Sequence, residues 1–159
     1  MKQKSKIKKK LLIFIVAYNA ELTISWVLKR IPVTLKNDFI VEVLIIDDQS
    51  SDNTSKVSQS FSSNANFNFP IKILCNPINQ GYGGNQKIGY HYAIKNDFDF
   101  VALIHGDGQY PPEELPRIME PFIKSEYDAV FGSRMLEKGA ALKGGMPLYK
   151  FIGNKVLTK

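Results

Sequence analysis

Short hydrophobic runs recur along this chain, and each is followed by a polar loop and a longer amphipathic stretch. The runs are rich in Val, Ile and Phe and fall at residues 11–17, 41–46, 71–74, 100–104 and 129–131. Unbroken apolar runs of this length are typical of parallel strands that are covered on both faces. The pattern therefore predicts an α/β fold with a mostly parallel sheet flanked by helices.

Four helices are expected between and after these strands, at residues 21–30, from 51 or 52 to about 61, at 85–94 and from 111 onward. Apolar side chains recur there at helical spacing, and Pro32 ends the first stretch. Pro111 and Pro112, followed by two acids, suit the first turn of the fourth helix. Residues 62–70, which carry three asparagines, predict a surface loop.

Composition favours one globular domain in a reducing compartment. The chain has 159 residues, of which 44% are hydrophobic, enough for a sizeable core. No hydrophobic run approaches the ~20 residues that a membrane-spanning helix needs. The run at 11–17 resembles the centre of a secretory signal, but it ends without a cleavage site, and its β-branched residues suit a strand. Cys75 follows an apolar run, so we expect it to be a buried, unpaired side chain in a cytoplasmic protein.

Positive charge is concentrated at the N-terminus. The formal net charge is +6, and six lysines stand within the first ten residues. Setting those six aside from the 21 basic residues leaves 15, which equals the number of acids, so the rest of the chain does not predict nucleic-acid binding. Residues 1–10 are expected to form a basic arm before a domain at 11–159. The arm is either a solubilising tail or a membrane-surface segment that gains at most ~1 kcal/mol per lysine from anionic lipid.

Acidic side chains stand where the second predicted strand ends. Asp47 and Asp48 follow it directly, and two carboxylates there can accept hydrogen bonds from a base or a ribose. A simpler interpretation is that Asp48, Ser50 and Asp52 cap the next helix. Two aspartates at a strand end also occur in phosphoacceptor receiver domains, but the Ser-Ser-Asp-Asn-Thr that follows here has no place in them.

A glycine-rich segment, residues 76–86, precedes the third helix. Gly81, Gly83 and Gly84 would let backbone amides approach a ligand, and a helix start favours an anion. The segment does not match the phosphate-binding pattern G-x-x-x-x-G-K-[ST]. A tight turn with positive φ is an equally good interpretation.

The fourth predicted strand delivers His105 and Asp107 two residues apart, with Gln109 beyond the turn. Imidazole, carboxylate and amide groups could bind Mg²⁺ or Mn²⁺ and leave coordination positions for a diphosphate. A lone His-x-Asp is more often a surface hydrogen-bond pair, but two further strand-end motifs accompany this one. The sequence therefore predicts a nucleotide-and-metal site at the carboxyl edge of the sheet.

The motifs, in this order and spacing, resemble those of family 2 glycosyltransferases of the GT-A fold, in particular the dolichyl- or polyprenyl-phosphate sugar synthases. The similarity runs from about Leu11 to the end of the chain and rests on five segments: residues 17–21, 47–54, 79–85, 107–113 and 132–134.

The resemblance implies a UDP- or GDP-sugar donor, a polyprenyl or dolichyl phosphate acceptor at the cytoplasmic membrane face, and peripheral contact with the membrane. Asp107, Gln109 and His105 would hold the metal. Asp107 and Arg134 would act in catalysis, Arg134 by facing phosphate charge. Such enzymes invert the anomeric centre by direct displacement. The resemblance also implies eight donor-binding residues: Ala17, Tyr18, Glu21, Asp48, Ser50, Gly83, Asn85 and Gly106.

Two features depart from the family pattern. The family shows Asp-x-Asp where this chain has His105-Gly106-Asp107, which alters the charge around a bound metal. The chain ends at Lys159, soon after residues 144–154, which resemble the start of an amphipathic, membrane-facing element, so a shortened chain is expected.

These departures leave alternatives to an active transferase. One is a nucleotide-sugar-binding module without turnover. Another is a sugar-phosphate nucleotidyltransferase, but the glycine-rich, basic N-terminal loop of such an enzyme is replaced here by Tyr18-Asn19-Ala20-Glu21.

Overall fold

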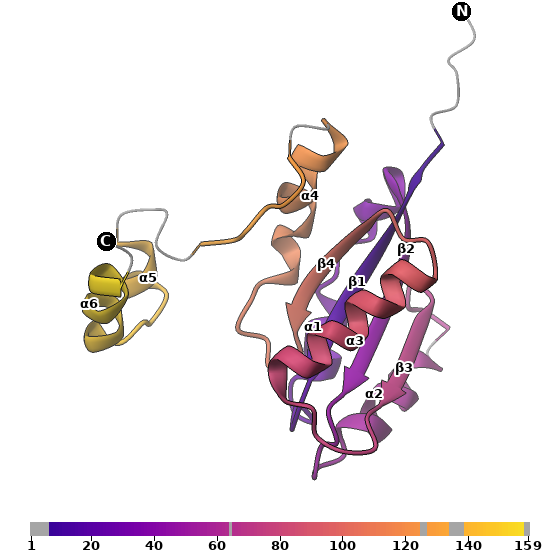
Figure 1. The fold of residues 1–159 in the computed structure, drawn as a ribbon, viewed down its shortest axis with the longest axis horizontal. Coiled ribbons are helices and arrows are strands. Elements are labelled where there is room, and N and C mark those ends of the chain that lie inside the picture. Colours follow the sequence, from indigo (N-terminus) through magenta and orange to yellow (C-terminus); the bar gives the residue numbers. More distant parts are fainter. Residues whose placement is uncertain (1–6, 64, 125–126, 134–138, 158–159) are drawn as a thin grey trace, which may run out of the picture.

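A four-stranded parallel sheet forms the centre of the protein (Figure 1). The computed structural model describes residues 7–63, 65–124, 127–133 and 139–157. The strands are β1 (Lys9–Ala17), β2 (Phe39–Asp47), β3 (Ile71–Cys75) and β4 (Phe100–His105), in the order β3-β2-β1-β4. Every pairing within this sheet is parallel. The predicted fold class and the first four predicted strands are thereby confirmed.

The first strand begins two residues earlier than its hydrophobic run, inside the predicted basic arm. Lys9 and Lys10 pair with Phe39 and Ile40 of β2. The Lys10 N–H donates to Asp99 Oδ2 at 2.8 Å, and the Lys9 ammonium lies 3.2 Å from Asp99 Oδ1. These contacts hold the pKa of Asp99 below its ordinary value. The last two lysines of the arm therefore belong to the folded sheet.

The prediction of a fifth strand is wrong. Residues 129–131 do not form a strand, and the side chain of Phe131 is 89% exposed. A run of three apolar residues becomes a strand only beside a partner with which it can share backbone hydrogen bonds. Here the chain turns away from the outer edge of β4 after the fourth helix (Figure 1).

Alternate residues of β1 face two separate hydrophobic cores. Leu11, Ile13 and Ile15 pack with side chains of α1 (Ile24–Lys29), α2 (Thr54–Ser62) and α4 (Leu115–Ile123). Leu12, Phe14 and Val16 pack on the opposite face, beneath α3 (Gly81–Lys95) (Figure 1). Because both faces are covered, the strand is hydrophobic at every position from Leu11 to Ala17.

The helices form where expected, with shifted ends. α1 is shorter than the predicted stretch 21–30. α3 begins four residues earlier than predicted, because Gly81, with a φ of +69°, makes the turn and the glycines after it are already helical. The fourth helix opens with a short 3₁₀ turn, η2 (Pro112–Glu114), before α4. Another 3₁₀ turn, η1 (Val33–Asn37), connects α1 to β2.

Two expectations about burial are wrong. The predicted surface loop at 62–70 contributes Phe67 and Phe69 to the core, and Phe69 is only 5% exposed. The ring centroids of Phe67 and Phe69 lie 5.7 Å apart. Cys75, predicted to be buried, is exposed because it ends the edge strand β3, and its Sγ lies 3.1 Å from Ser55 Oγ.

Beyond α4, the chain leaves the sheet through residues 127–133 and reaches α5 (Ala140–Lys143) and α6 (Leu148–Leu157). These two helices lie beside each other and away from the sheet (Figure 1). None of the residues of α6 is buried. Among the described residues, no helix combines the length and the apolar character that crossing a bilayer requires.

At Gly89, α3 packs directly against the Phe14 ring of β1, and this contact leads to a stability prediction. A Cβ at Gly89 would lie 2.2 Å from the Phe14 ring, whereas a Cβ at Gly83, on the same helix, would meet nothing within 4 Å. We expect Gly89→Ala to lower the free energy of unfolding by about 1–3 kcal/mol, as overpacking does. Gly83→Ala should leave it unchanged or raise it by up to about 1 kcal/mol. Urea unfolding followed by circular dichroism measures both, and equal losses would contradict the packing explanation.

Candidate functional site

The carboxyl ends of β1, β2 and β4 meet at one edge of the sheet, with β1 in the middle. The Asp48 N–H donates to the Ala17 carbonyl, and the Gly106 N–H donates to the Val16 carbonyl, both at 2.9 Å. These bonds hold the loops after β2 and β4 on either side of the end of β1. The structure therefore brings these three strand-end motifs together.

Gly106 lies against the end of β1 at a distance that only glycine allows without displacement of its neighbours. A Cβ at this position would lie 3.2 Å from the Val16 carbonyl oxygen and 3.3 Å from the Cβ atoms of Ala17 and Ala20. The Thr23 hydroxyl donates to the Gly106 carbonyl at 2.7 Å. In the structure Gly106 thus serves close packing between two loops, and its predicted contact with a donor stays a prediction.

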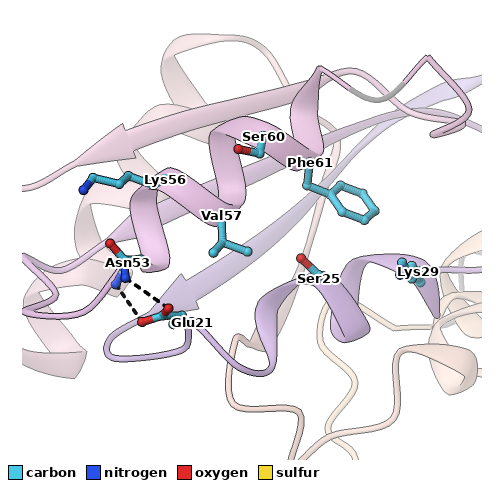
Figure 2. A pocket seen from close by; sticks show the side chains of 8 residues that line it. All are labelled: Glu21, Ser25, Lys29, Asn53, Lys56, Val57, Ser60 and Phe61. Carbon is cyan, nitrogen blue, oxygen red and sulfur yellow. Dashed lines mark hydrogen bonds between the residues drawn. The ribbon is translucent and has the colours of Figure 1, made fainter.

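Hydrogen bonds join the loop after β1 to the start of α2. The hydroxyl of Thr54, which is fully buried, accepts from the Ala20 N–H at 2.7 Å, and Asp52 accepts from the Glu21 N–H at 3.0 Å. Glu21 in turn accepts from the backbone and side-chain amides of Asn53 at 3.0 and 3.1 Å (Figure 2). Burial alone would raise the pKa of Asp52, but the bonds from Thr54 and Glu21 outweigh it and lower that pKa.

The side chain of Asp47 stabilises its own loop. It is 4% exposed, and its Oδ1 accepts from the backbone N–H of Ser50 at 3.1 Å and also from the Ser50 hydroxyl. Ser50 Oγ accepts from the Asn19 N–H at 2.9 Å, which links this loop to the one after β1. Ser50, predicted to bind the donor, is therefore a connection between two loops in this structure.

Asp48 connects β2 to the glycine-rich segment. The residue is 3% exposed, and its Oδ1 accepts from the Gln80 N–H at 2.8 Å and from the Asn76 side-chain amide at 2.7 Å. Its carbonyl accepts from the side-chain amide of Asn79 at 2.9 Å. Asp48 therefore does not cap α2, and the interpretation of this residue as a cap is wrong.

The start of α3 is held against the end of β2 by Asn85. This side chain is 2% exposed, and its amide donates to the Ile46 carbonyl at 3.0 Å. Its Oδ1 is buried without a hydrogen-bond partner in the described part of the chain. Gly83, half a turn earlier, faces open space. The two predicted donor-binding residues of α3 thus differ, one buried in the fold and one accessible.

His105 lies between two tyrosines. Its Nε2 is 3.0 Å from Tyr82 Oη, and its ring meets those of Tyr82 and Tyr110 edge-on, with centroids 5.2 and 4.8 Å apart. Burial raises the pKa of Tyr82 above its ordinary value. One nitrogen of the predicted ligand His105 is therefore engaged with Tyr82, and a metal role for the residue stays a prediction.

Asp107 and Gln109 are the accessible members of the predicted metal site. Both are exposed, and the Gln109 N–H donates to Asp107 Oδ1 at 3.0 Å. Within the described ranges, no group of three or more His, Cys, Asp and Glu side chains could enclose a metal ion. One carboxylate and one amide nevertheless fit a Mg²⁺ or Mn²⁺ ion that is shared with a diphosphate, because phosphate oxygens and water complete such sites.

A shallow groove also runs between α1 and α2 (Figure 2). It is lined by Glu21, Ser25, Lys29, Asn53, Lys56, Val57, Ser60 and Phe61. Of the predicted donor-binding residues, only Glu21 lines this groove. The groove therefore meets the strand-end loops at Glu21 and Asn53, and its other lining residues lie on α1 and α2.

The remaining predicted residues are divided by exposure. Tyr18 is 56% exposed, whereas Ala17 is 2% exposed. Arg134 lies outside the described residues. The sequence pointed to Thr54 and Asn76 only as members of the segments 47–54 and 76–86, and it named neither as a site residue.

Solved structures of other proteins have a similar fold. The chain resembles TarS of S. aureus in complex with UDP-GlcNAc, with a TM-score of 0.56 and 22% identity over 73% of this chain and 31% of that one. It also resembles the mannosyltransferase PcManGT from Pyrobaculum calidifontis in complex with GDP-Man and Mn²⁺, with a TM-score of 0.56 and 15% identity over 67% of this chain and 30% of that one. The fold is that of the GT-A glycosyltransferases.

Sequence comparison then gives the family. The model of glycosyl transferase family 2 matches residues 12–155, so the chain belongs to that family. The UDP-N-acetylglucosamine–dolichyl-phosphate N-acetylglucosaminyltransferase of Methanococcus voltae is 29% identical over 92% of this chain and 59% of its own length. The dolichol-phosphate mannosyltransferase of Pyrococcus furiosus is 28% identical over 82% and 34%. The chain spans little more than half the length of the first curated relatives that it matches.

Thr54 provides a test of the connection between the first two loops. We expect Thr54→Val to leave the buried Ala20 N–H unpaired and to lower the free energy of unfolding by about 1–3 kcal/mol. Thr34→Val is the matched control, because Thr34 is exposed, and its effect should stay within about 0.5 kcal/mol. Urea unfolding measures both variants. A loss at position 54 no larger than that at position 34 would show that this bond does not hold the loops.

Proposed function

We propose that this chain forms the donor-binding part of an inverting, metal-dependent glycosyltransferase. It moves a sugar from a nucleoside-diphosphate donor to a polyprenyl or dolichyl phosphate. The observation that carries the proposal is the meeting of three strand-end loops at one sheet edge, with the carboxylate of Asp107 exposed beside the end of β1.

The residues at this edge have complementary roles in the proposal. Tyr18 and Glu21, with Ala17 and Asp48 behind them, seat the base and ribose, since an exposed aromatic ring and carboxylates suit a nucleoside. Gly83, in the first turn of α3, leaves room for the donor to approach that helix.

Asp107 and Gln109 hold Mg²⁺ or Mn²⁺ at the donor diphosphate. When bound, the ion neutralises charge on the departing nucleoside diphosphate. A phosphate acceptor is already ionised, so the displacement needs no strong general base from the chain. To Arg134, which lies outside the described residues, we assign the binding of phosphate charge on donor or acceptor, a role that suits its forked donors.

The relatives support this choice of substrates. Two of them are named for dolichyl or dolichol phosphate, and one of these is also named for UDP-N-acetylglucosamine. A structure of the same fold contains GDP-Man and Mn²⁺. These substrates belong to those proteins, and we extend the donor and acceptor classes to this chain as a proposal.

The donor site can be tested by calorimetric titration of the 159-residue chain with UDP-GlcNAc and GDP-mannose, each with and without Mn²⁺. We expect one donor to bind, and only with metal. Asp107→Ala should weaken that binding about tenfold or more, as loss of a charged contact does. Asp38→Ala, which removes an exposed carboxylate elsewhere, is the control.

Three results would separate the alternatives. Wild-type donor affinity in Asp107→Ala would contradict the metal role. Metal-dependent binding without sugar transfer to a polyprenyl phosphate would indicate a nucleotide-sugar-binding module. Absence of binding to either nucleotide sugar would contradict the proposed donor class.

We place the acceptor at the cytoplasmic membrane surface, with α6 in peripheral contact with lipid. Leu148, Ile152 and Val156 are 63%, 54% and 69% exposed and share one face of this helix. Residues 139–157 carry three lysines and no acid. An exposed apolar face flanked by lysines suits an anionic bilayer.

Vesicle co-sedimentation with anionic and neutral lipid tests this contact. We expect binding to anionic vesicles and a loss of about tenfold or more in Ile152→Glu, because an isoleucine side chain gains about 1.5–3 kcal/mol on burial. Ile94→Glu on α3 is the control, since Ile94 is 75% exposed and also helical. Equal losses in the two variants would exclude α6 as the contact.

A further inference from the structure

Helix α1 runs alongside the segment from Gly106 to Glu113. At the start of α1, the Thr23 hydroxyl donates to the Gly106 carbonyl at 2.7 Å. At its end, Arg30 Nη2 donates to Glu113 Oε2 at 2.7 Å, and Arg30 Nε donates to Oε1. The two partners in each contact are 83 positions apart in the sequence, so the two segments run side by side in the same direction.

Trp26 supports the middle of this segment. Gly108 has a φ of +73°, and a Cβ there would lie 2.5 Å from Trp26 Cζ3 and 3.6 Å from Val27 Cγ2. The turn that follows Asp107 therefore rests directly on the indole ring. A side chain at position 108 would meet both backbone strain and the ring.

Arg30 joins this support to Glu113. Its guanidinium lies 3.7 Å from the centroid of the Trp26 ring, and its side chain is 22% exposed. The bond from Arg30 holds the pKa of Glu113 below its ordinary value. Arg30 Nη1 is buried without a partner in the described part of the chain. A forked ion pair together with a ring contact restrains this guanidinium more than most surface charges.

We propose that Arg30 is a positioning residue for the turn that carries Asp107 and Gln109. Held between the Trp26 ring and Glu113, its guanidinium fixes the turn at the sheet edge where the donor diphosphate and its metal bind. The proposal rests on the proposed function of those two residues. Ligand side chains must be held to within about 0.5 Å, and the residues behind them provide that restraint.

Amide hydrogen exchange tests the restraint without any ligand. The variants are Arg30→Met, Glu113→Gln and the double variant. We expect the Gly108 and Gln109 amides to exchange about tenfold faster in each single variant, the change that loss of a charged hydrogen bond produces. The double variant should exchange no faster than Arg30→Met alone, because that variant already removes the contact with Glu113. Arg117→Met is the control, since Arg117 is 74% exposed and pairs with Glu114 within its own segment.

The same variants are then titrated with Mn²⁺ and the donor that the wild-type chain binds. We expect metal-dependent affinity to fall about fivefold to tenfold in Arg30→Met and Glu113→Gln, and to stay unchanged in Arg117→Met. If Arg30→Met does not fold, Glu113→Gln decides alone, because the Glu113 side chain is 49% exposed.

Unchanged exchange at Gly108 and Gln109 would overturn the proposal, and so would faster exchange with unchanged donor affinity. Equally faster exchange of these amides in Arg117→Met would also overturn it, because it would indicate a general loosening of the structure. A wild-type chain that binds no donor would overturn the proposed function instead, and the exchange rates would still decide whether Arg30 restrains the turn.

Discussion

The position of β1 is the constraint on which the rest of this structure depends. The strand pairs in parallel along both edges and is buried on both faces, so it fixes β2, β4 and both cores at once. Where its ladder ends, the carbonyls of Val16 and Ala17 still need partners. The loops after β4 and β2 supply them through Gly106 and Asp48. The candidate site is therefore a continuation of the hydrogen bonding of the sheet, and its geometry derives from the register of the strands.

The polar residues at this edge divide into those that build the loops and those that remain accessible. Asp48, Thr54 and Asn85 are almost fully buried: Asp48 and Thr54 bond neighbouring loops, and the Asn85 side-chain amide donates to the Ile46 carbonyl of β2. Tyr18 and Asp107 are exposed. Buried polar groups that are paired in this way fix one loop conformation, because any other arrangement leaves them unsatisfied in a medium of low dielectric constant. A donor would meet a surface whose shape is already set.

The sequence predicted the sheet well and the loops only in part. Four strands and the meeting of their polar ends followed from hydrophobic runs, since parallel strands buried on both faces admit few polar residues. The strand at 129–131 and the surface loop at 62–70 were wrong, because pairing at an edge and the burial of Phe67 and Phe69 depend on tertiary neighbours. Glu21 and Ser50 were predicted as ligands, yet each also bonds a neighbouring loop. Nothing local in the sequence pairs Arg30 with Glu113, which are 83 positions apart.

That separation has a consequence for the order in which the protein assembles. Contacts between residues far apart in sequence form only after the entropy of closing the intervening chain has been lost, so they tend to form late in folding. The bonds from Thr23 to Gly106 and from Arg30 to Glu113 are of this kind. During synthesis from the N-terminus, α1 must wait until the chain as far as Glu113, 83 positions beyond Arg30, has left the ribosome before its partner segment exists. The turn that bears Asp107 is thus among the last parts of the sheet edge to be fixed, and a nascent chain that ends before Glu113 cannot yet hold it.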